Sequence, residues 1–130
     1  MKKIKLGLIR EGRIPPDKRV AFTPAQVEEI MQRYPGVEVV VQTSPLRCFE
    51  DHEYKAVGVE VVDQVADCDI LMGIKEVQIP DLHAGKTYLF FSHTLKKQPY
   101  NKKLLQEILK RKIRLVDYEA LKDSQGNRLV

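Results

Sequence analysis

A short apolar run that ends on polar residues constrains the fold of this chain more than any other feature. Residues 87–91 read TYLFF, Gly85 stands just before them, and Ser92, His93 and Thr94 follow directly. A bounded run of this length is typical of a central strand in a parallel sheet, which is covered on both faces. Ligands of open α/β sheets bind at the carboxyl ends of the strands, so this strand would deliver His93 to a binding edge.

A second apolar run follows the same pattern. Residues 70–74 read ILMGI and are followed by Lys75 and Glu76. If the two runs form neighbouring strands, Lys75 and His93 are presented at one edge of the sheet. An amine and an imidazole at such an edge suit acid–base chemistry at a carbonyl or imine carbon. The ordinary alternatives are a strand-end lysine that reaches into solvent and a histidine satisfied within its own loop.

The order of the remaining patterns predicts a parallel α/β sheet in a single domain, residues 1–130. Thr23-Pro24-Ala25-Gln26 has the form of a capping box that starts a helix. Strands are predicted at residues 4–9, 37–42, 59–62, 70–74, 87–91 and 113–118, and a further strand begins at 128–130. Helices are predicted at residues 24–34, 50–57 and from 99 or 101 to 112, with a helical turn at 63–67.

Two arginines in long polar loops are candidates for binding a carboxylate. Arg19 lies four residues before the helix cap at Thr23, in a connection too long for a minimal strand-to-helix turn. Its planar fork and the nearby helix N-terminus both favour an anion. Arg47 is a weaker candidate of the same kind. Glu76 and Glu119 follow predicted strand ends. For all four residues the alternative is a simple surface charge.

Composition excludes several classes of protein. With 43% hydrophobic and 31% charged residues, the chain is typical of soluble globular domains, and no apolar stretch is long enough to span a membrane. The first residues read as a strand without an export signal. The two cysteines, Cys48 and Cys68, form no redox or disulfide pattern, so we expect a reducing, cytoplasmic setting.

Metal, nucleic-acid and dinucleotide sites find little support in the sequence. The residues Cys48, His52, Cys68 and His83 match no recognised zinc-ligand spacing. The basic residues between 96 and 114 scatter around a predicted helix, where Glu107 and Arg111 can pair at i, i+4, so a solvated face is expected and no nucleic-acid partner. The seven glycines form neither a G-x-G-x-x-G fingerprint nor a P-loop.

Three segments in order resemble the N-terminal domain shared by alanine dehydrogenase, proton-translocating transhydrogenase and the lysine-forming saccharopine dehydrogenases. They are RVAFTP at residues 19–24, IKE at 74–76 and FSH at 91–93. Within that superfamily the chain is most similar to the lysine-ketoglutarate reductase branch, through residues 86–98, Asn101 with Leu104 and Leu105, and residues 113–119. The resemblance covers nearly the whole chain.

The resemblance implies a Rossmann-like three-layer fold with a mainly parallel sheet, forming the substrate side of a two-domain dehydrogenase. The chain would then be a fragment of a longer protein, docked on a following domain that binds NAD or NADP. No cofactor-binding residue and no metal ligand is expected in the chain itself. We therefore expect it to fold but not to catalyse alone, while the full protein could form a homo-oligomer.

The resemblance also implies roles for individual residues. Lys75 and His93 would be the acid–base pair at the carbon that exchanges hydride, Arg19 would bind a carboxylate of the amino-acid or keto-acid substrate, and Glu76 and Glu119 would tune Lys75. The reaction would be oxidation or reduction at the CH–NH group of an amino acid. Alternatives are an alanine dehydrogenase or transhydrogenase domain, although the stretch 94–100 is longer than alanine dehydrogenases have there, and a non-catalytic amino-acid-binding or interaction module.

Overall fold

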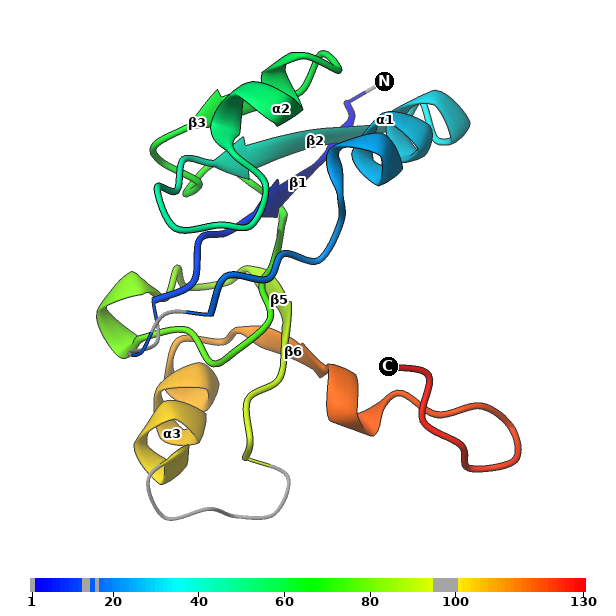
Figure 1. Ribbon diagram of the computed structural model, residues 1–130. Helices are drawn as coiled ribbons and strands as arrows, with labels where there is room; N and C mark the ends of the chain where they lie inside the picture. The colour runs from blue at the N-terminus through cyan, green and yellow to red at the C-terminus, as the bar shows by residue number, and fades with distance from the viewer. Residues whose placement is uncertain (1, 13–14, 16, 95–100) are drawn as a thin grey trace.

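The computed structural model describes residues 2–12, 15, 17–94 and 101–130 and forms a six-stranded parallel sheet (Figure 1). The strand order is β3-β2-β1-β4-β5-β6, and every pairing between these strands is parallel. The strands are β1 (Ile4–Leu8), β2 (Val37–Gln42), β3 (Glu60–Val62), β4 (Ile70–Met72), β5 (Thr87–Phe90) and β6 (Arg114–Asp117). The helices are α1 (Pro24–Arg33), α2 (Asp51–Lys55), α3 (Lys102–Lys110) and the 3₁₀ turns η1 (Ile79–Asp81) and η3 (Tyr118–Ala120).

The order of the strands reverses between β1 and β4. The chain builds β1, β2 and β3 outward in one direction, returns across the sheet, and builds β4, β5 and β6 outward in the other direction. At such a reversal the connections that leave the two central strands run in opposite directions, and doubly wound folds bind ligands in the crevice between those connections. The predicted α/β, Rossmann-like fold is confirmed.

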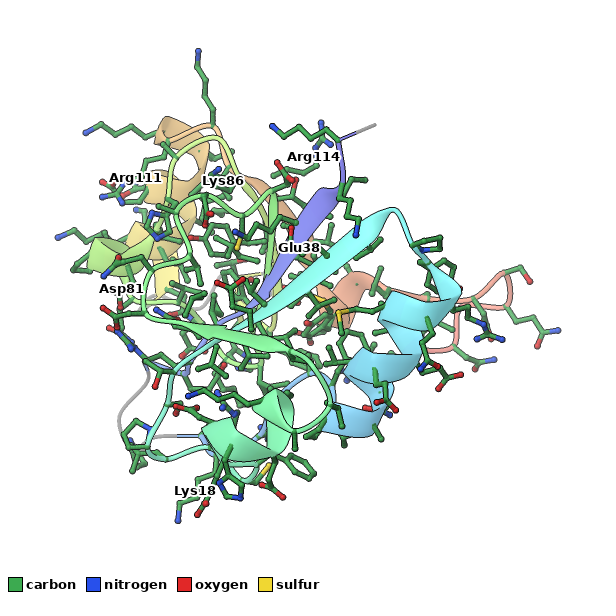
Figure 2. All side chains as sticks on the ribbon, turned by 90° about the horizontal axis from the view of Figure 1, so that it is seen from above. Lys18, Glu38, Asp81, Lys86, Arg111 and Arg114 are labelled. Atoms are coloured by element: carbon green, nitrogen blue, oxygen red, sulfur yellow. The ribbon has the colours of Figure 1, made fainter. Side chains whose placement is uncertain are left out.

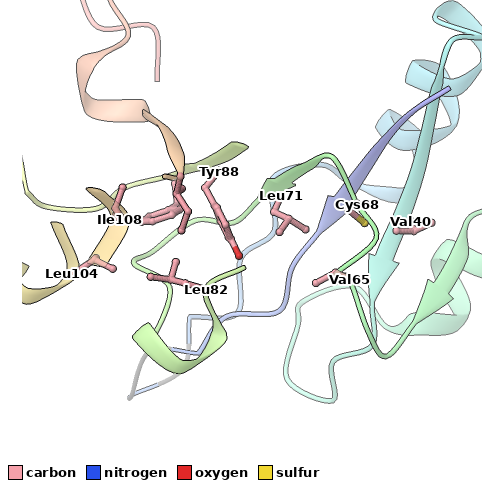
Figure 3. Close-up of a cluster of buried hydrophobic side chains, with 10 residues drawn as sticks. Val40, Val65, Cys68, Leu71, Leu82, Tyr88, Leu104 and Ile108 are labelled. Carbon is pink, nitrogen blue, oxygen red and sulfur yellow. The ribbon is translucent and has the colours of Figure 1, made fainter. Parts of the chain in front are cut away.

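The alternation of side chains along β2 divides the core between the two faces of the sheet. Val39 and Val41 pack with Val27 of α1 and Tyr54 of α2 on one face. Val40 points to the other face, where α3 packs. Figure 3 shows this second cluster, to which Val65, Cys68, Leu71, Leu82, Tyr88, Leu104 and Ile108 contribute.

Most predicted elements are present, with shorter bounds. The capping box at Thr23 is confirmed, since its side chain accepts from the backbone N–H of Gln26 while Gln26 accepts from that of Thr23. The strand predicted to run to residue 74 ends at Met72, and the helix predicted from residue 99 or 101 begins at Lys102, its earlier part lying outside the described residues except for Asn101.

Two predicted elements are wrong. Residues 63–67 form bends and turns in place of a helical turn, because Val65 and Cys68 are both drawn into the core and the Cys68 N–H bonds the Val65 carbonyl at 3.0 Å. Residues 128–130 form no strand, although Arg128 makes one antiparallel bridge to Lys122. Leu129 and Val130 are exposed, so no apolar surface holds that end in a sheet. Among the described residues, no helix has the length and apolar character needed to cross a membrane.

Gly7, in the middle of β1, allows the crossover before β4 to pack against the sheet. A β-carbon at Gly7 would lie 2.8 Å from Cys68 Sγ and 3.0 Å from a methyl carbon of Leu71, both fully buried. We expect Gly7→Ala to lower the free energy of unfolding by about 1–3 kcal/mol through overpacking, measured by chemical denaturation. Gly36→Ala is the control, because a β-carbon there meets nothing within 4 Å. An equal effect of both substitutions would contradict this account of the packing.

Candidate active site

The carboxyl ends of β4 and β5 bring Lys75, Glu76 and His93 to one edge of the sheet. The two strands pair in parallel from Ile70↔Thr87 to Met72↔Leu89. Beyond the strands, the Phe91 N–H donates to the Ile74 carbonyl at 2.8 Å, so the two turns that follow remain side by side. The expectation that the lysine and the histidine follow neighbouring parallel strands therefore holds, while their catalytic roles stay a prediction.

His93 and Glu76 form a half-buried pair across this edge. His93 Nε2 lies 3.6 Å from Glu76 Oε2, with side-chain exposures of 30% and 12%. The imidazole nitrogen is buried and has no hydrogen-bond partner among the described residues. A carboxylate this close to an imidazole can orient the ring, and an imidazole at a strand end is a group that can accept and return a proton.

Lys75 lies against an aromatic wall. Its Nζ is 5.9 Å from the centroid of the Phe91 ring, at the outer range of a cation–π contact. That ring packs edge-on against Tyr118 of η3, with centroids 5.0 Å apart. The Tyr118 hydroxyl is buried without a hydrogen-bond partner among the described residues, and burial raises its pKa. The wall therefore shields one side of the ammonium group from water.

Glu11 is the residue of this site that the sequence analysis missed. It follows β1, and its two carboxylate oxygens accept the backbone N–H groups of Lys75 at 2.7 Å and Ile74 at 3.1 Å. Burial raises the pKa of this carboxyl, although the two N–H donors oppose the shift. The available signal was its position directly after the first strand, equivalent to that of Lys75 after β4.

Arg19 is held by a neighbouring carboxylate. Its Nε and Nη2 donate to the two oxygens of Asp17 at 2.9 and 2.6 Å. Arg19 lowers the pKa of Asp17 to about 2, and the charge of Lys75 contributes to the same shift. The loop thus brings the Arg19–Asp17 pair into the electrostatic field of Lys75. A substrate carboxylate would have to compete with Asp17 for the guanidinium of Arg19.

Arg47 has a structural environment. Its side chain is only 4% exposed, and its guanidinium donates to Asp51 at 2.6 Å and to the carbonyls of Phe49 and Gln42, each at 2.8 Å. It also stacks 4.8 Å from the ring centroid of Tyr54. These contacts tie the loop after β2 to α2, and they weigh against the predicted role in binding substrate.

The remaining predicted residue, Glu119, lies in η3, directly after β6. Its backbone N–H donates to Asp117 Oδ1 at 2.9 Å. Since β6 pairs with β5, this turn borders the one that carries His93. Glu119 therefore belongs to the same edge of the sheet as Lys75, which lies after the next strand but one.

A hollow of about 340 Å³ opens at this edge on the face that α3 covers. Lys75, Glu76 and Glu11 border it, whereas His93, Arg19, Arg47 and Glu119 do not. Its outer wall includes Asp81 of η1, and Arg111 of α3 anchors that turn by donating to the carbonyls of Ile79 and Leu82 at 3.0 and 3.2 Å. Figure 2 shows Asp81 and Arg111 on the same side of the molecule.

The metal and nucleic-acid alternatives gain no geometric support. Within the described ranges, no three His, Cys, Asp or Glu side chains are grouped as metal ligands. Cys68 is instead a buried core residue, and both cysteines are free thiols. In the basic segment, Arg111 Nε pairs with Glu107 at 3.0 Å, which confirms the expected i, i+4 pair.

The two hydrogen bonds from the turn after β4 to Glu11 can be tested by their contribution to stability. Glu11→Ala leaves the N–H groups of Ile74 and Lys75 without their acceptor, while it also removes the cost of burying the carboxylate. We expect a net loss of about 1–2 kcal/mol in the free energy of unfolding, measured by urea denaturation at pH 7. The control, Glu29→Ala, removes an exposed carboxylate of α1 and should cost less than about 0.5 kcal/mol. Equal losses of unfolding free energy in the two variants would show that the hydrogen bonds to Glu11 do not stabilise the fold.

The Arg19–Asp17 pair predicts a specific pH response. Because the pKa of Asp17 is lowered in the folded chain, its contribution to stability is present above pH 3.8 and is lost as the pH falls through about 2. In Arg19→Ala, the pKa of Asp17 should return toward 3.8, as followed by carboxyl-carbon NMR titration. Arg33→Ala, which removes a guanidinium paired with Glu29, should leave it unchanged. A pKa near 2 in Arg19→Ala would assign the shift to another group.

Known proteins support a single family assignment. The chain is 37% identical over 128 residues to the mitochondrial alpha-aminoadipic semialdehyde synthase of Bos taurus, covering 98% of this chain and 14% of that protein. It is 30% identical over 131 residues to the saccharopine dehydrogenase [NAD(+), L-lysine-forming] of Yarrowia lipolytica, covering 97% of this chain and 35% of that protein. The chain thus spans about a third or less of the length of these relatives.

A solved structure and a family match point the same way. The fold superimposes on an L-alanine dehydrogenase with a TM-score of 0.79 at 17% identity, over 95% of this chain and 35% of that one. Residues 7–130 match the family described as "Alanine dehydrogenase/PNT, N-terminal domain". The parallel sheet, the edge that carries Lys75 and His93, and these similarities agree, and the chain belongs to the alanine dehydrogenase/PNT N-terminal domain family.

Proposed function

We propose that residues 1–130 are the substrate-side domain of an amino-acid oxidoreductase of the saccharopine dehydrogenase or lysine-ketoglutarate reductase type. The observation that carries the proposal is the placement of Lys75 and His93 after adjacent parallel strands, with Glu76 beside the histidine. A relative named saccharopine dehydrogenase matches 97% of the chain, whereas the alanine dehydrogenase of Mycolicibacterium smegmatis matches 67% of it, which favours this branch over alanine dehydrogenase. The reaction would exchange a hydride at the CH–NH group of an amino acid.

The chain's own residues do not fit a dinucleotide site. β1 ends at Leu8 and α1 begins only at Pro24, so no tight glycine turn links the first strand to a helix N-terminus. NAD or NADP would therefore be bound by a second domain that follows this one in a longer protein, and it would supply the hydride acceptor or donor. The present domain would dock on that one and handle the substrate and the protons.

Lys75 and His93 divide the proton chemistry in this proposal. The Lys75 ammonium, beside Phe91, would stabilise negative charge that develops on the carbonyl oxygen of the keto acid while the amine adds to it, before the imine forms and accepts hydride. His93, paired with Glu76, would take the proton released by the substrate amine and return it in the reverse direction. Glu76 and Glu119 would adjust the charge around this pair, because both follow strands at the same edge.

Arg19 would bind a substrate carboxylate in exchange for Asp17. The Arg19 side chain is 62% exposed, so a ligand can reach it, and its guanidinium already binds one carboxylate in a bidentate geometry. Arg47 is not part of this proposal, since its donors are committed to Asp51 and to backbone carbonyls. The proposed setting is a reducing one such as the cytoplasm, in which Cys48 and Cys68 remain thiols.

The proposal is tested in the longer protein that contains this chain and its following domain. Reduced NAD or NADP, lysine and 2-oxoglutarate are supplied, and cofactor oxidation is followed by absorbance. We expect Lys75→Met and His93→Gln each to lower kcat by about 10²- to 10⁴-fold. Arg19→Lys should raise KM for the keto acid by about tenfold or more, because a bidentate fork is lost.

Matched controls lie at the amino ends of the strands, opposite the carboxyl ends that carry the candidate site. Lys86→Met, just before β5, and Arg114→Lys, at the start of β6, should leave both kinetic constants unchanged. Full activity in Lys75→Met would refute the proposed role. Amino-acid binding by the longer protein without any cofactor oxidation would instead support a non-catalytic binding module.

A further inference from the structure

His93 has a left-handed backbone, which few residues other than glycine adopt. Among the described residues, only His93 and Lys112 combine a side chain with a positive φ, 57° and 54°. Lys112 follows the C-cap of α3, where a left-handed residue commonly ends a helix. His93 follows a strand and ends no helix. Its β-carbon is crowded against the backbone, so its surroundings must hold this conformation.

Ser92, directly before the histidine, is fully buried and hydrogen-bonded on every side. Its hydroxyl donates to Asp117 Oδ2, and its N–H donates to the same oxygen at 3.2 Å. Ser92 Oγ in turn accepts the Thr94 N–H at 3.2 Å and, because its own proton is used, the Thr94 hydroxyl at 2.6 Å. The Ser92 carbonyl accepts from Asn101 Nδ2 at 2.8 Å. The residues on both sides of His93 are thus anchored.

Asp117 connects this anchor to a second turn. It is the last residue of β6, and while its Oδ2 accepts from Ser92, its Oδ1 accepts the backbone N–H of Glu119 at 2.9 Å. One carboxylate therefore holds both the turn that carries His93 and the turn that carries Glu119. Parallel pairing of Phe90 with Asp117 aligns the two strand ends at the required spacing.

We propose that Asp117, acting through Ser92, is a positioning residue that holds His93 in its left-handed conformation and keeps the imidazole beside Glu76. The backbone part of this inference rests on the contacts alone. Its catalytic consequence rests on the proposed function, in which His93 moves a proton. Displacing a catalytic group by about 1 Å can lower a rate by about 10²-fold, so loss of the anchor should reduce turnover more than substrate binding.

The backbone part is tested in this chain by comparing His93→Gly with His93→Ala. In a left-handed position glycine is unstrained and alanine is strained, so His93→Gly should have the higher Tm. When Asp117→Asn is added, the turn can relax, and the difference in Tm between the His93→Gly and His93→Ala variants should disappear. Full relief of the strain should reverse it, because alanine restricts the unfolded chain more than glycine does. If Asp117→Asn does not fold, Ser92→Ala takes its place. An unchanged Tm difference in the altered background would overturn the proposal.

The catalytic part is tested in the longer protein. Asp117→Asn and Ser92→Ala should each lower kcat by about tenfold or more while KM changes by less than about threefold. Ile108→Ala is the control for stability alone, since it opens the core under α3 seven residues after Asn101, and kcat measured well below its Tm should be unchanged. Equal loss of kcat in Ile108→Ala would contradict positioning. If the wild-type longer protein is inactive, the proposed function fails, and the Tm comparison decides the positioning role by itself.

Discussion

The acceptance of two backbone N–H groups by the half-buried Glu11 carboxylate is the interaction on which the candidate site depends. β1 and β4 pair from Leu6↔Ile70 to Leu8↔Met72, and one further backbone bond follows, from the Ile9 N–H to the Met72 carbonyl at 2.9 Å. Glu11 continues the connection past the end of the ladder by binding Ile74 and Lys75. Without it, the turn that carries Lys75 and Glu76 would keep its backbone bonds to the β5 side, at Gly73 and Ile74, but would lose these two bonds to the β1 side.

The same edge collects opposite charges under partial burial. Arg19 and Lys75 lower the pKa of Asp17, while Asp17 contributes to the raised pKa of Glu11. Mixed charges in a recess are costly to assemble unless each is partnered. Here carboxylates bind guanidinium and amide donors, and the aromatic wall of Phe91 and Tyr118 borders the ammonium. Of these groups, Glu11 and Lys75 border the hollow, whereas Asp17 and Arg19 lie outside its lining.

Local patterns in the sequence predicted the strands, the parallel sheet and the presence of Lys75 and His93 at one edge, because apolar runs and polar strand ends are visible without any tertiary information. They did not predict Glu11 or Asp117, whose importance comes from backbone amides far along the chain. They also assigned Arg19 and Arg47 the same chemistry. Only the structure shows that Arg19 is exposed and paired with Asp17, whereas Arg47 is buried and bound to Asp51 and to carbonyl oxygens. The turn at 63–67 was misjudged because tertiary packing of Val65 and Cys68 overrode the local signal.

The bonds that shape this edge join distant parts of the chain. Glu11 and Lys75 are 64 residues apart, and Ser92 and Asp117 are 25 apart. Contacts of such separation form late, since loop-closure entropy must be overcome before they contribute stability. During synthesis, a nascent chain that has emerged only through β5 would have Lys75 anchored by Glu11 but would lack the carboxylate that anchors Ser92. The part of the site around Lys75 can therefore form before the part around His93, and the complete site requires that β6 has joined the sheet.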